Sequence, residues 1–507
     1  MGINKIIIVG GGSAGWMTAA TLIKVFPEKD ITLIESPNIA TVGVGESTLG
    51  QIRQWCALIG LNDREFIPYT DASIKMSIKF TNFSKIGEAF HYPFGVPNLN
   101  NNYAEMNDWW FKKIANPKLS CSDFADSMYP IMALVNQNKC TEERIEGIDY
   151  IYDRDTAFHF DATKFGLWLK DHICIPNGVK HIKEEIKAIN LNEDGIANLN
   201  NKYKADLFID CTGFKAQLMN KMNVPFESLN DLLPNDSAWA TRIPYKNKKK
   251  ELVPYTNCTA YNNGWIWNIP LWSRIGTGYV YSSKFVSDED ALKEFKKYLK
   301  VKDGDFKNIK MRVGIHERLW LKNVCAIGLS AGFIEPLESN GLFSVHEFLY
   351  FLCRTLKRGY VNQYDKDGFT AACKNKFYNF ATFVALHYAL SQRTDTPYWK
   401  HTFNKTWDEK LYKLNPTLTN TLHRVVYDKF HNFRFEPGLG IAAICAGNNY
   451  APADIVSLQY ENHLKEVEML KSAYTEMGNK LDKKKEHWNK LVKDAPSLYN
   501  FLKNIHD

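Results

Sequence analysis

The stretch Lys5–Glu35, KIIIVGGGSAGWMTAATLIKVFPEKDITLIE, decides the fold. It opens with a β-branched run that is typical of a buried parallel strand, and it passes through the glycine-rich residues 10–15 into a helical apolar pattern. A second apolar run follows and ends at Glu35. This order of strand, glycine turn, helix and strand is the context in which Gly-x-Gly-x-x-Gly binds a dinucleotide.

Each part of this stretch has a defined task in such a site. Gly10 allows the tight turn, Gly12 lets the backbone approach a pyrophosphate, and Gly15 lets the helix pack closely on the strand. The helix N-terminus faces the phosphates, and Glu35, about twenty residues further on, can accept a hydrogen bond from a ribose hydroxyl. The pattern predicts a nucleotide site without choosing between FAD and NAD.

Composition and charge describe an ordinary globular chain. Of the 507 residues 45% are hydrophobic and 23% are charged, and the net charge is +7. The densest basic runs, 248–250 and 483–485, contain three lysines each and are typical of solvated faces, so we expect no nucleic-acid partner. The ten cysteines show no C-x-x-C spacing, which predicts reduced, buried thiols and no metal site.

No segment has the pattern of a signal peptide or a membrane span. Lys5 leads directly into a strand, and the apolar stretches 324–334 and 438–447 are shorter than the ~18 residues that a span needs. We therefore expect a soluble, cytoplasmic protein.

The remaining pattern indicates an α/β nucleotide-binding body with a helical C-terminal region. We expect a core over 1–345, a substrate-facing insertion near 95–150, and helices over most of 346–507. A hairpin is predicted at 180–199, and a helix start capped by Asp161 follows His159 and Phe160. Further predicted elements are a loop at 42–48, strands at 205–209, 265–270 and 324–329, and helices at 49–59, 345–356, 368–388, 418–430 and 456–477.

Several motifs, in order along residues 6–400, together resemble the flavin-dependent halogenases of the tryptophan halogenase type. They are Gly10–Met17, Gly43–Thr48, Ser73–Met76, Phe158–Ala162, Asp210–Phe214, the W-x-W-x-I-P box at Trp265–Pro270, Gly332–Ser339 and His387–Trp399. The resemblance implies a flavin-hydroxylase-like FAD-binding fold with mixed sheets.

The resemblance also implies a reaction. Such enzymes use FADH2 delivered by a separate flavin reductase, together with O2, to oxidise chloride, bromide or iodide to hypohalous acid. This acid reaches a lysine beside an electron-rich aromatic substrate. The single dinucleotide fingerprint fits a two-component scheme, because no second one is present for a nicotinamide. A homo-oligomer is compatible with this two-component scheme.

Two residues are implied to be catalytic. Lys75 lies among apolar neighbours, where an ammonium is costly unless it has a task, whereas Lys79 on the same alternating strand is predicted to be a surface lysine. A cationic Lys75 can polarise hypohalous acid, and a neutral one can form a haloamine. Glu338 can stabilise the arenium cation and accept its proton. The alternative for Glu338 is a helix cap, a structural role that we assign to Glu335.

Cofactor and halide residues follow from the same motifs. The halide is implied to bind at the backbone amides of Asn340 and Gly341, and many relatives carry threonine where Asn340 stands. The predicted cofactor residues are Gly10, Gly12, Ser13, Ala14, Gly15, Glu35, Gly45, Glu46, Ser47, Thr48, Asp210, Thr212, Gly213 and Gly328.

Two alternatives remain beside the halogenase. A flavin-dependent aromatic hydroxylase, a monooxygenase, shares the fingerprint, but usually has Gly-Asp after the late strand, where this chain has Gly328-Leu329. A non-catalytic FAD-fold binding protein would have no use for Lys75 and Glu338.

The substrate is predicted to be aromatic or indole-like. Residues 438–450 contain no tryptophan to clamp a free tryptophan substrate, so that substrate is disfavoured. An aromatic wall is predicted from His91, Phe94 and Trp109.

Overall fold

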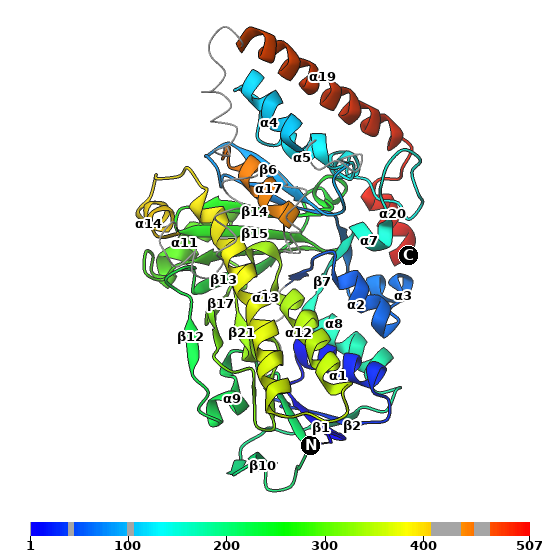
Figure 1. Cartoon of the computed structure of the whole chain (residues 1–507), viewed down its shortest axis with the longest axis vertical. Coiled ribbons are helices and arrows are strands. Elements are labelled where there is room, and N and C mark those ends of the chain that lie inside the picture. The colour runs from blue at the N-terminus through cyan, green and yellow to red at the C-terminus, as the bar shows by residue number, and fades with distance from the viewer. Residues whose placement is uncertain (1, 39–44, 99–105, 407–437, 451–466) are drawn as a thin grey trace.

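The N-terminal strands β1 and β2 lie in a six-stranded sheet with strand order β19-β20-β11-β1-β2-β8. The computed structural model describes residues 2–38, 45–98, 106–406, 438–450 and 467–507 (Figure 1). The strands are β1 (Lys5–Val9), β2 (Asp30–Glu35), β8 (Lys180–Lys183), β11 (Leu207–Asp210), β19 (Trp320–Leu321) and β20 (Val324–Ala326). β1 pairs in parallel with both β2 and β11, which confirms the predicted parallel arrangement.

A seven-stranded mixed sheet has the order β17-β13-β16-β15-β14-β5-β6. β5 pairs in parallel with β14, and the other pairs are antiparallel. Trp265 and Trp267 alternate on β15 as predicted, and both are buried. The strands are β5 (Ser77–Thr81), β6 (Ala89–Pro93), β13 (Ser237–Ile243), β14 (Tyr255–Tyr261), β15 (Gly264–Pro270), β16 (Ile275–Tyr281) and β17 (Lys307–Lys310).

A small sheet of β3 (Gly45–Ser47), β7 (Ala157–Asp161) and β4 (Ser73–Lys75) differs from the prediction. Residues 45–47 were expected in a loop, but they pair with β7, and the rest of that loop up to residue 44 lies outside the described residues. His159 and Phe160, which precede the predicted helix start, lie in the strand β7, which was not predicted. Asp161 does cap α8 (Ala162–Trp168), accepting hydrogen bonds from two backbone amides.

Shorter strands complete the sheets. The hairpin predicted over 180–199 is confirmed for β9 (Ile189–Asn192) and β10 (Gly195–Leu199), which pair antiparallel, whereas residues 180–183 form β8 and pair in parallel with β2. A three-stranded sheet consists of β12 (Phe226–Ser228), β18 (Gly314–His316) and β21 (Gly332–Phe333).

Helices cover the parallel sheet and form the regular structure of the described residues after 340. α1 (Ser13–Val25) packs on β2 and on α12 (Gly341–Leu356), which packs in turn on α13 (Gln363–Ala389) (Figure 1). Other helices are α2 (Ile52–Ile59), α3 (Asp63–Tyr69), α9 (Gln217–Lys221), α10 (Lys248–Glu251), α11 (Asp288–Leu299), α14 (Pro397–Thr406), α17 (Gly438–Gly447) and α20 (Leu498–His506).

The predicted insertion and the C-terminal helix pack together. The insertion holds α4 (Met106–Ala115), α5 (Asp123–Met128) and α6 (Met132–Asn136), and α7 (Tyr152–Asp155) follows it. α19 (Val467–Leu491) lies along α4 in Figure 1. The predicted helix at 418–430 lies outside the described residues, and that at 456–477 is described only from Val467. The boundary at 345 falls within α12 and stays a prediction.

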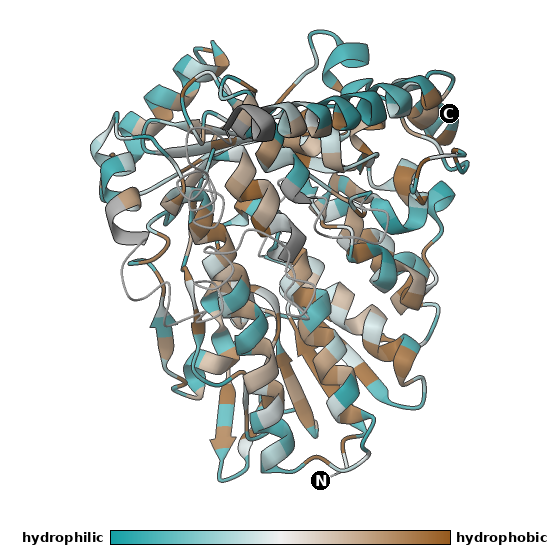
Figure 2. Cartoon of the chain, turned by 45° about the horizontal axis from the view of Figure 1, so that its top comes forward, coloured by the Kyte–Doolittle hydropathy of each residue, from teal (hydrophilic) through white to brown (hydrophobic). Residues whose placement is uncertain are grey.

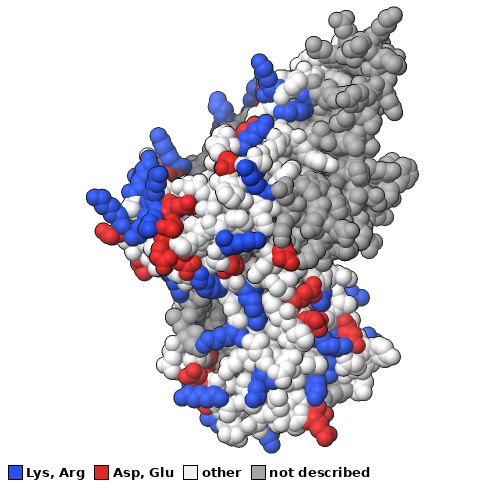
Figure 3. All heavy atoms as spheres, turned by 90° about the vertical axis from the view of Figure 1, so that its left-hand side faces the viewer, with Lys and Arg blue, Asp and Glu red and all other residues white. Residues whose placement is uncertain are grey.

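The interior and the surface agree with the composition. The strands of the parallel sheet are strongly apolar in Figure 2, and all ten cysteines are free and buried as predicted. Positive and negative side chains are interspersed over the face shown in Figure 3. Among the described helices, none has both the length and the apolar character required for a membrane span.

Candidate functional site

The β1–α1 turn has the geometry of a dinucleotide cradle. Gly10 has φ +115°, and a Cβ there would lie 2.2 Å from the Cys211 carbonyl oxygen. A Cβ at Gly15 would lie 1.9 Å from the Gly10 carbonyl oxygen, so the helix packs directly on the turn. A Cβ at Gly12 would meet nothing within 4 Å, and no side chain caps α1. The free helix N-terminus therefore faces open space that fits a pyrophosphate.

Other predicted cofactor residues gather at the same sheet edge. Glu35 ends β2, and its Oε1 lies 2.8 Å from His181 Nε2. Gly328 follows β20 with φ +69°, and a Cβ there would lie 2.7 Å from the Ala14 Cβ. A Cβ at Gly213 would meet no atom within 4 Å, so backbone is exposed here as well.

The Asp210 carboxylate shapes this edge from within. It accepts hydrogen bonds from the Thr212 backbone and hydroxyl at 3.0 and 2.7 Å, and from the Leu218 and Met219 amides at 2.7 and 3.0 Å. Asp210 therefore holds the turn after β11 and the start of α9, which leaves the backbone of Thr212 and Gly213 to face a ligand. The residues present fit a bound FAD.

Lys75 ends β4 in a fully buried position. Its Nζ donates hydrogen bonds to the Thr48 carbonyl oxygen at 2.9 Å and to Ser339 Oγ at 2.8 Å, and it lies 5.0 Å from the centroid of the Phe94 ring. Ser339 has φ 57°, a left-handed conformation that costs a residue with a side chain about 1–3 kcal/mol. The strained turn brings the Ser339 hydroxyl to the lysine.

Burial changes the acidity of Lys75. Desolvation lowers its pKa to about 7, although the neighbouring Glu338 and Cys258 oppose this change. The lysine is therefore able to hold or release a proton near neutral pH. Two of its protons are engaged by Thr48 and Ser339, so the third position on Nζ is free to act on a bound reactant.

Glu338 lies in the buried turn Pro336–Glu338 and faces His387 of α13. Glu338 Oε1 is 2.7 Å from His387 Nε2, but the two groups are not aligned for a hydrogen bond. Neither carboxylate oxygen has a hydrogen-bond partner within the described residues. Because a buried polar group without a partner is costly, this carboxylate is shaped for a ligand or a reaction and not for stability.

Glu335 has a different task from the predicted helix cap, which is wrong. The N-cap position that it occupies shows no side-chain cap hydrogen bond. Its buried carboxylate accepts hydrogen bonds from Asn235 Nδ2 at 2.6 Å and from the Tyr388 hydroxyl. Burial raises its pKa to about 7. Glu335 is an internal structural carboxylate near Glu338.

The predicted halide residues lie at the start of α12. Asn340 occupies the N-cap position of this helix, and its Nδ2 donates to the Ile334 carbonyl oxygen at 3.3 Å. Its buried Oδ1 has no hydrogen-bond partner within the described part of the chain, and a Cβ at Gly341 would meet nothing within 4 Å.

The three predicted substrate residues are not brought together. Phe94 lies at Lys75. The His91 Nδ1 lies 2.8 Å from Ser77 Oγ, on the β5–β6 pair, and burial lowers its pKa to about 3. Trp109 is a core residue of the insertion, where its ring contacts Phe124 and its Nε1 donates to Asp123 at 3.2 Å.

Glu46, Ser47 and Thr48 lie on and beside β3. Burial raises the pKa of Glu46 to about 7, and Asp161 adds to this effect. Ser47 and Thr48 are connected to the Lys75 centre, since Thr48 binds Lys75 directly and Ser47 Oγ accepts a hydrogen bond from Ser339 at 3.1 Å.

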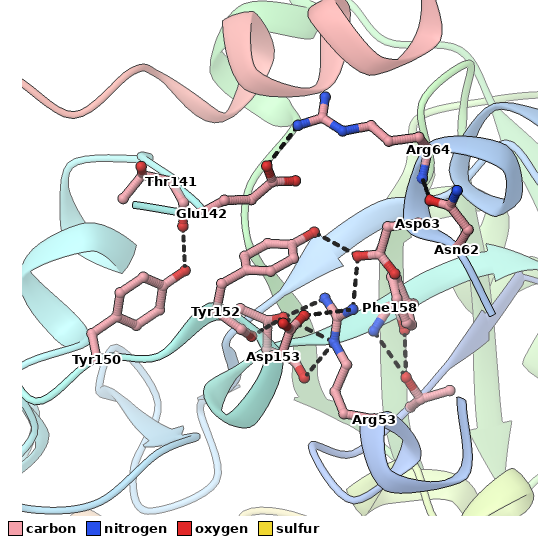
Figure 4. A network of polar contacts seen from close by, with 12 residues as sticks. Arg53, Asn62, Asp63, Arg64, Thr141, Glu142, Tyr150, Tyr152, Asp153 and Phe158 are labelled. Carbon is pink, nitrogen blue, oxygen red and sulfur yellow. Dashed lines mark hydrogen bonds and ion pairs between the residues drawn. The ribbon is translucent and has the colours of Figure 1, made fainter. Parts of the chain in front are cut away.

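A network around the buried side chain of Arg53 supports the segment that contains Thr48 (Figure 4). Arg53 stacks on Phe158, with its guanidinium carbon 4.1 Å from the ring centroid, and pairs with Asp63 at 2.7 Å. Phe158 is fixed to Thr48, whose hydroxyl and amide bond to the Phe158 backbone at 2.9 and 3.0 Å. The network therefore holds the Thr48 carbonyl in place for Lys75.

Sequence reasoning missed several residues of this centre. His387 and Ser339 were noted only as members of motifs, and Thr256, whose Oγ1 lies 2.7 Å from Ser47 Oγ, was not marked by any motif. All three reach the centre through long-range packing, and no local sequence pattern predicts such contacts. Within the described residues no group of three or more His, Cys, Asp or Glu side chains could hold a metal ion.

A nucleotide cradle and a buried lysine–carboxylate centre in one α/β body define the class of dinucleotide-binding enzymes, and comparisons with known proteins identify the family. The tryptophan halogenase family model matches residues 5–458. Tryptophan 6-halogenase SttH of Streptomyces toxytricini is 35% identical over 425 residues, which cover 79% of this chain and 80% of the relative.

Solved structures agree with this match. The VirX1 apo structure has a TM-score of 0.89 and 38% identity, and the alignment covers 99% of each chain. BrvH, a flavin-dependent halogenase from Brevundimonas sp. BAL3, has a TM-score of 0.84 and 28% identity, with 100% of this chain and 99% of that chain covered.

The chain belongs to the tryptophan halogenase family. The predicted FAD-binding α/β fold with mixed sheets and a helical C-terminal region is confirmed, as is the predicted activity of a flavin-dependent halogenase.

Proposed function

We propose that this halogenase transfers an electrophilic halogen to an electron-rich aromatic or indole-like substrate at the Lys75–Glu338 centre. The observation that carries the proposal is a fully buried ammonium beside a fully buried carboxylate whose oxygens have no hydrogen-bond partner among the described residues. Nothing in the packing requires this arrangement, whereas an aromatic halogenation requires both groups.

Lys75 holds the hypohalous acid. Thr48 and Ser339 take two of its N–H groups, and the third donates a hydrogen bond to the oxygen of HO–X. This polarises the O–X bond, so the halogen is transferred to the ring as the bond breaks. The released oxygen ends as water. Overall, a C–H bond and an O–X bond break, and a C–X bond and an O–H bond form.

Glu338 takes the proton that the ring must lose. Its carboxylate stabilises the arenium cation and then accepts the proton from the same carbon. His387 Nδ1 lies 3.1 Å from the Phe383 carbonyl oxygen, so Nδ1 carries a proton and Nε2 faces Glu338. The edge of the imidazole therefore lies against the carboxylate without a hydrogen bond to it.

FAD, supplied as FADH2 by a separate flavin reductase, and O2 would provide the oxidising chemistry. The adenine half fits the cradle at Gly10, Gly12 and Gly15, with Glu35 at a ribose. The halide fits the N-terminus of α12 at Asn340 and Gly341, where free amides and the helix dipole favour an anion.

We further propose that the substrate is not free tryptophan. α17 packs on β6 next to the substrate residues, and a Cβ at Gly440 would lie 2.8 Å from the Tyr92 ring. This helix, GLGIAAICAG, contains no charged residue to bind an amino-acid ammonium or carboxylate group. An indole or phenol without an amino-acid group fits such a wall.

Lys75→Ala tests this function. The variant should form no halogenated product, while FADH2 oxidation and peroxide release continue, because the lysine acts after the halide has been oxidised. The measurement compares product by mass spectrometry with flavin oxidation by absorbance, across a panel of indoles, phenols and tryptophan. Near wild-type product from Lys75→Ala would overturn the assignment.

A further inference from the structure

A continuous row of buried polar groups leads away from Lys75. Ser339 Oγ lies 3.1 Å from Ser47 Oγ, which lies 2.7 Å from Thr256 Oγ1, which lies 2.9 Å from His159 Nε2. The row connects β3, β14 and β7, and all of its members are buried.

The row continues beyond the imidazole to a backbone acceptor. His159 Nδ1 lies 3.1 Å from Ser73 Oγ, and the Ser73 hydroxyl donates to the Pro270 carbonyl oxygen. The row therefore contains residues of the Gly-Glu-Ser-Thr, Phe-His-Phe-Asp and W-x-W-x-I-P motifs, and His159 and Pro270 have no other task in the proposed reaction.

The hydrogen-bond directions follow from the far end. A carbonyl oxygen can only accept a hydrogen bond, so the Ser73 hydroxyl donates its proton to the Pro270 carbonyl. The Ser73 oxygen must then accept from His159 Nδ1. Burial, and then the charge of Lys75, hold the pKa of His159 well below its ordinary value, so the imidazole is neutral and Nε2 accepts.

The remaining hydroxyls then have one possible order. Thr256 donates to His159, Ser47 donates to Thr256, and Ser339 donates to Ser47. Every donor points away from Lys75, and every oxygen lone pair points back toward it. Such an aligned chain is cooperative, because each hydrogen bond polarises the next.

We propose that the chain Ser339–Ser47–Thr256–His159–Ser73, anchored on the Pro270 carbonyl, fixes the Lys75 side chain and favours its ammonium form. His159 and Thr256 are positioning residues that act through Ser47 and Ser339. The inference rests on the proposed role of Lys75. The other titratable groups near Lys75 are Glu338 on its turn and Cys258 on β14, and His159 is the one in the chain.

The test is the pH dependence of coupling, measured as halogenated product per FADH2 oxidised. If the ammonium is the active form, coupling falls as the pH rises through about 7, the pKa of Lys75. Thr256→Val removes the hydroxyl at nearly constant volume, so the chain is cut and the midpoint should move to lower pH by roughly half a unit.

Matched variants separate the chain from other effects. Thr256→Ser keeps the hydroxyl and should restore the wild-type midpoint. Thr259→Val changes a buried threonine on the same strand outside the chain and should leave the midpoint in place. Ser73→Ala, at the far end, should shift the midpoint in the same direction, and it replaces Thr256→Val if that variant does not fold.

The outcomes are distinguishable. An unchanged midpoint in folded Thr256→Val and Ser73→Ala, with Lys75→Ala inactive, would overturn the chain and leave the proposed function in place. Product formation by Lys75→Ala would overturn the proposed function itself. All variants are measured with the same substrate, halide and oxidant, so only the difference between their midpoint pH values is interpreted.

Discussion

Two carboxylates of one turn, Glu335 and Glu338, show how surroundings divide tasks between similar residues. Glu335 has two hydrogen-bond donors and is satisfied. Glu338 is equally buried, and its only close polar contact among the described residues is the misaligned His387. A buried carboxylate without donors is a costly group that a positive charge on the substrate would relieve.

Glu338→Gln should therefore slow halogenation by roughly 10²–10⁴, the usual contribution of a positioned base. Glutamine keeps the size, but it cannot neutralise an arenium cation or take its proton. Substrates with very electron-rich rings should be affected least, because their cations lose protons readily to water. Product formation over a panel of indoles and phenols measures the effect, with the melting temperature checked alongside.

Glu335→Gln is the matched control in the same turn. It should lower the melting temperature, because a donor-rich site then receives an amide, while the halogenation rate of the folded enzyme stays close to wild type. Equal rates for Glu338→Gln and the wild type would make Glu338 a structural residue and Glu335 the next carboxylate to change.

The sequence predicted the individual residues of this centre better than their connections. Lys75 and Glu338 were implied by motifs, and the structure places both in one buried centre. His387 and Thr256 could not be predicted, because pairing across distant elements leaves no local pattern. Trp109 illustrates the converse: an aromatic residue in the insertion looked available for a substrate but is packed in a local core.

At the scale of elements, the position of Lys75 is explained by a change of sheet. β4 belongs to the small sheet with β7, and β5, after Met76, belongs to the seven-stranded sheet. Met76 is fixed to the seven-stranded sheet on both sides of β5, since its amide donates to the Pro254 carbonyl before β14 at 2.7 Å and its carbonyl accepts from the Phe94 amide after β6 at 2.8 Å. Lys75 is thus held at the junction of two sheets.

The C-terminal helix α19 is fixed to the insertion by a buried ion cluster. Asp123 of α5 accepts hydrogen bonds from Lys112 of α4 at 2.7 Å and from Lys485 of α19 at 2.6 Å. Burial alone would raise the pKa of Asp123, but these two lysines lower it below its ordinary value. Asp482 of α19 also pairs with both lysines, with Lys112 at 2.7 Å and with Lys485 at 3.1 Å, so four charged groups connect α19 to α4 and α5.

Asp123→Asn should therefore destabilise the docking of α19 and lower the melting temperature. Removing one partner of a buried ion pair costs about 3–5 kcal/mol, and Asp482, which still pairs with both lysines, should offset part of this cost. Since the folded-state pKa is depressed, the stabilisation is present above the unfolded pKa of about 3.9 and is lost as the pH falls through the folded value. Thermal melts at pH 7 and under acid conditions measure both effects.

The control for this prediction is Asp290→Asn, which removes an exposed carboxylate paired with Lys293. Its melting temperature should stay close to wild type, because exposed pairs contribute little. If Asp123→Asn melts at the wild-type temperature at pH 7, the cluster does not hold α19.

For the whole molecule, the prediction from sequence was most successful where one local segment builds one feature. The β1–α1–β2 unit, the hairpin and the double-indole strand were predicted because turn chemistry and apolar periodicity act over a few residues. The strands β3 and β7 were not predicted, because these short strands form only by pairing between segments that are distant in the sequence. The Lys75 centre is built from the same kind of long-range contacts.

The number of dinucleotide cradles determines the source of electrons. A Gly-x-Gly-x-x-Gly turn between a strand and a helix occurs once in the sequence, at residues 10–15, and the structure shapes it as a single cradle. One cradle holds one dinucleotide, so a chain that binds FAD there has no equivalent second turn for NADPH.

The purified protein should therefore not consume NADPH, and it should form halogenated product only when a flavin reductase and FAD are added. Chemically reduced FAD should replace the reductase, because the reductase supplies FADH2 and nothing else. NADPH absorbance and product formation are followed in the same reaction, with Lys75→Ala as the control for uncoupled flavin oxidation. Rapid NADPH oxidation with product formation by the protein alone would show that it carries its own reductase function.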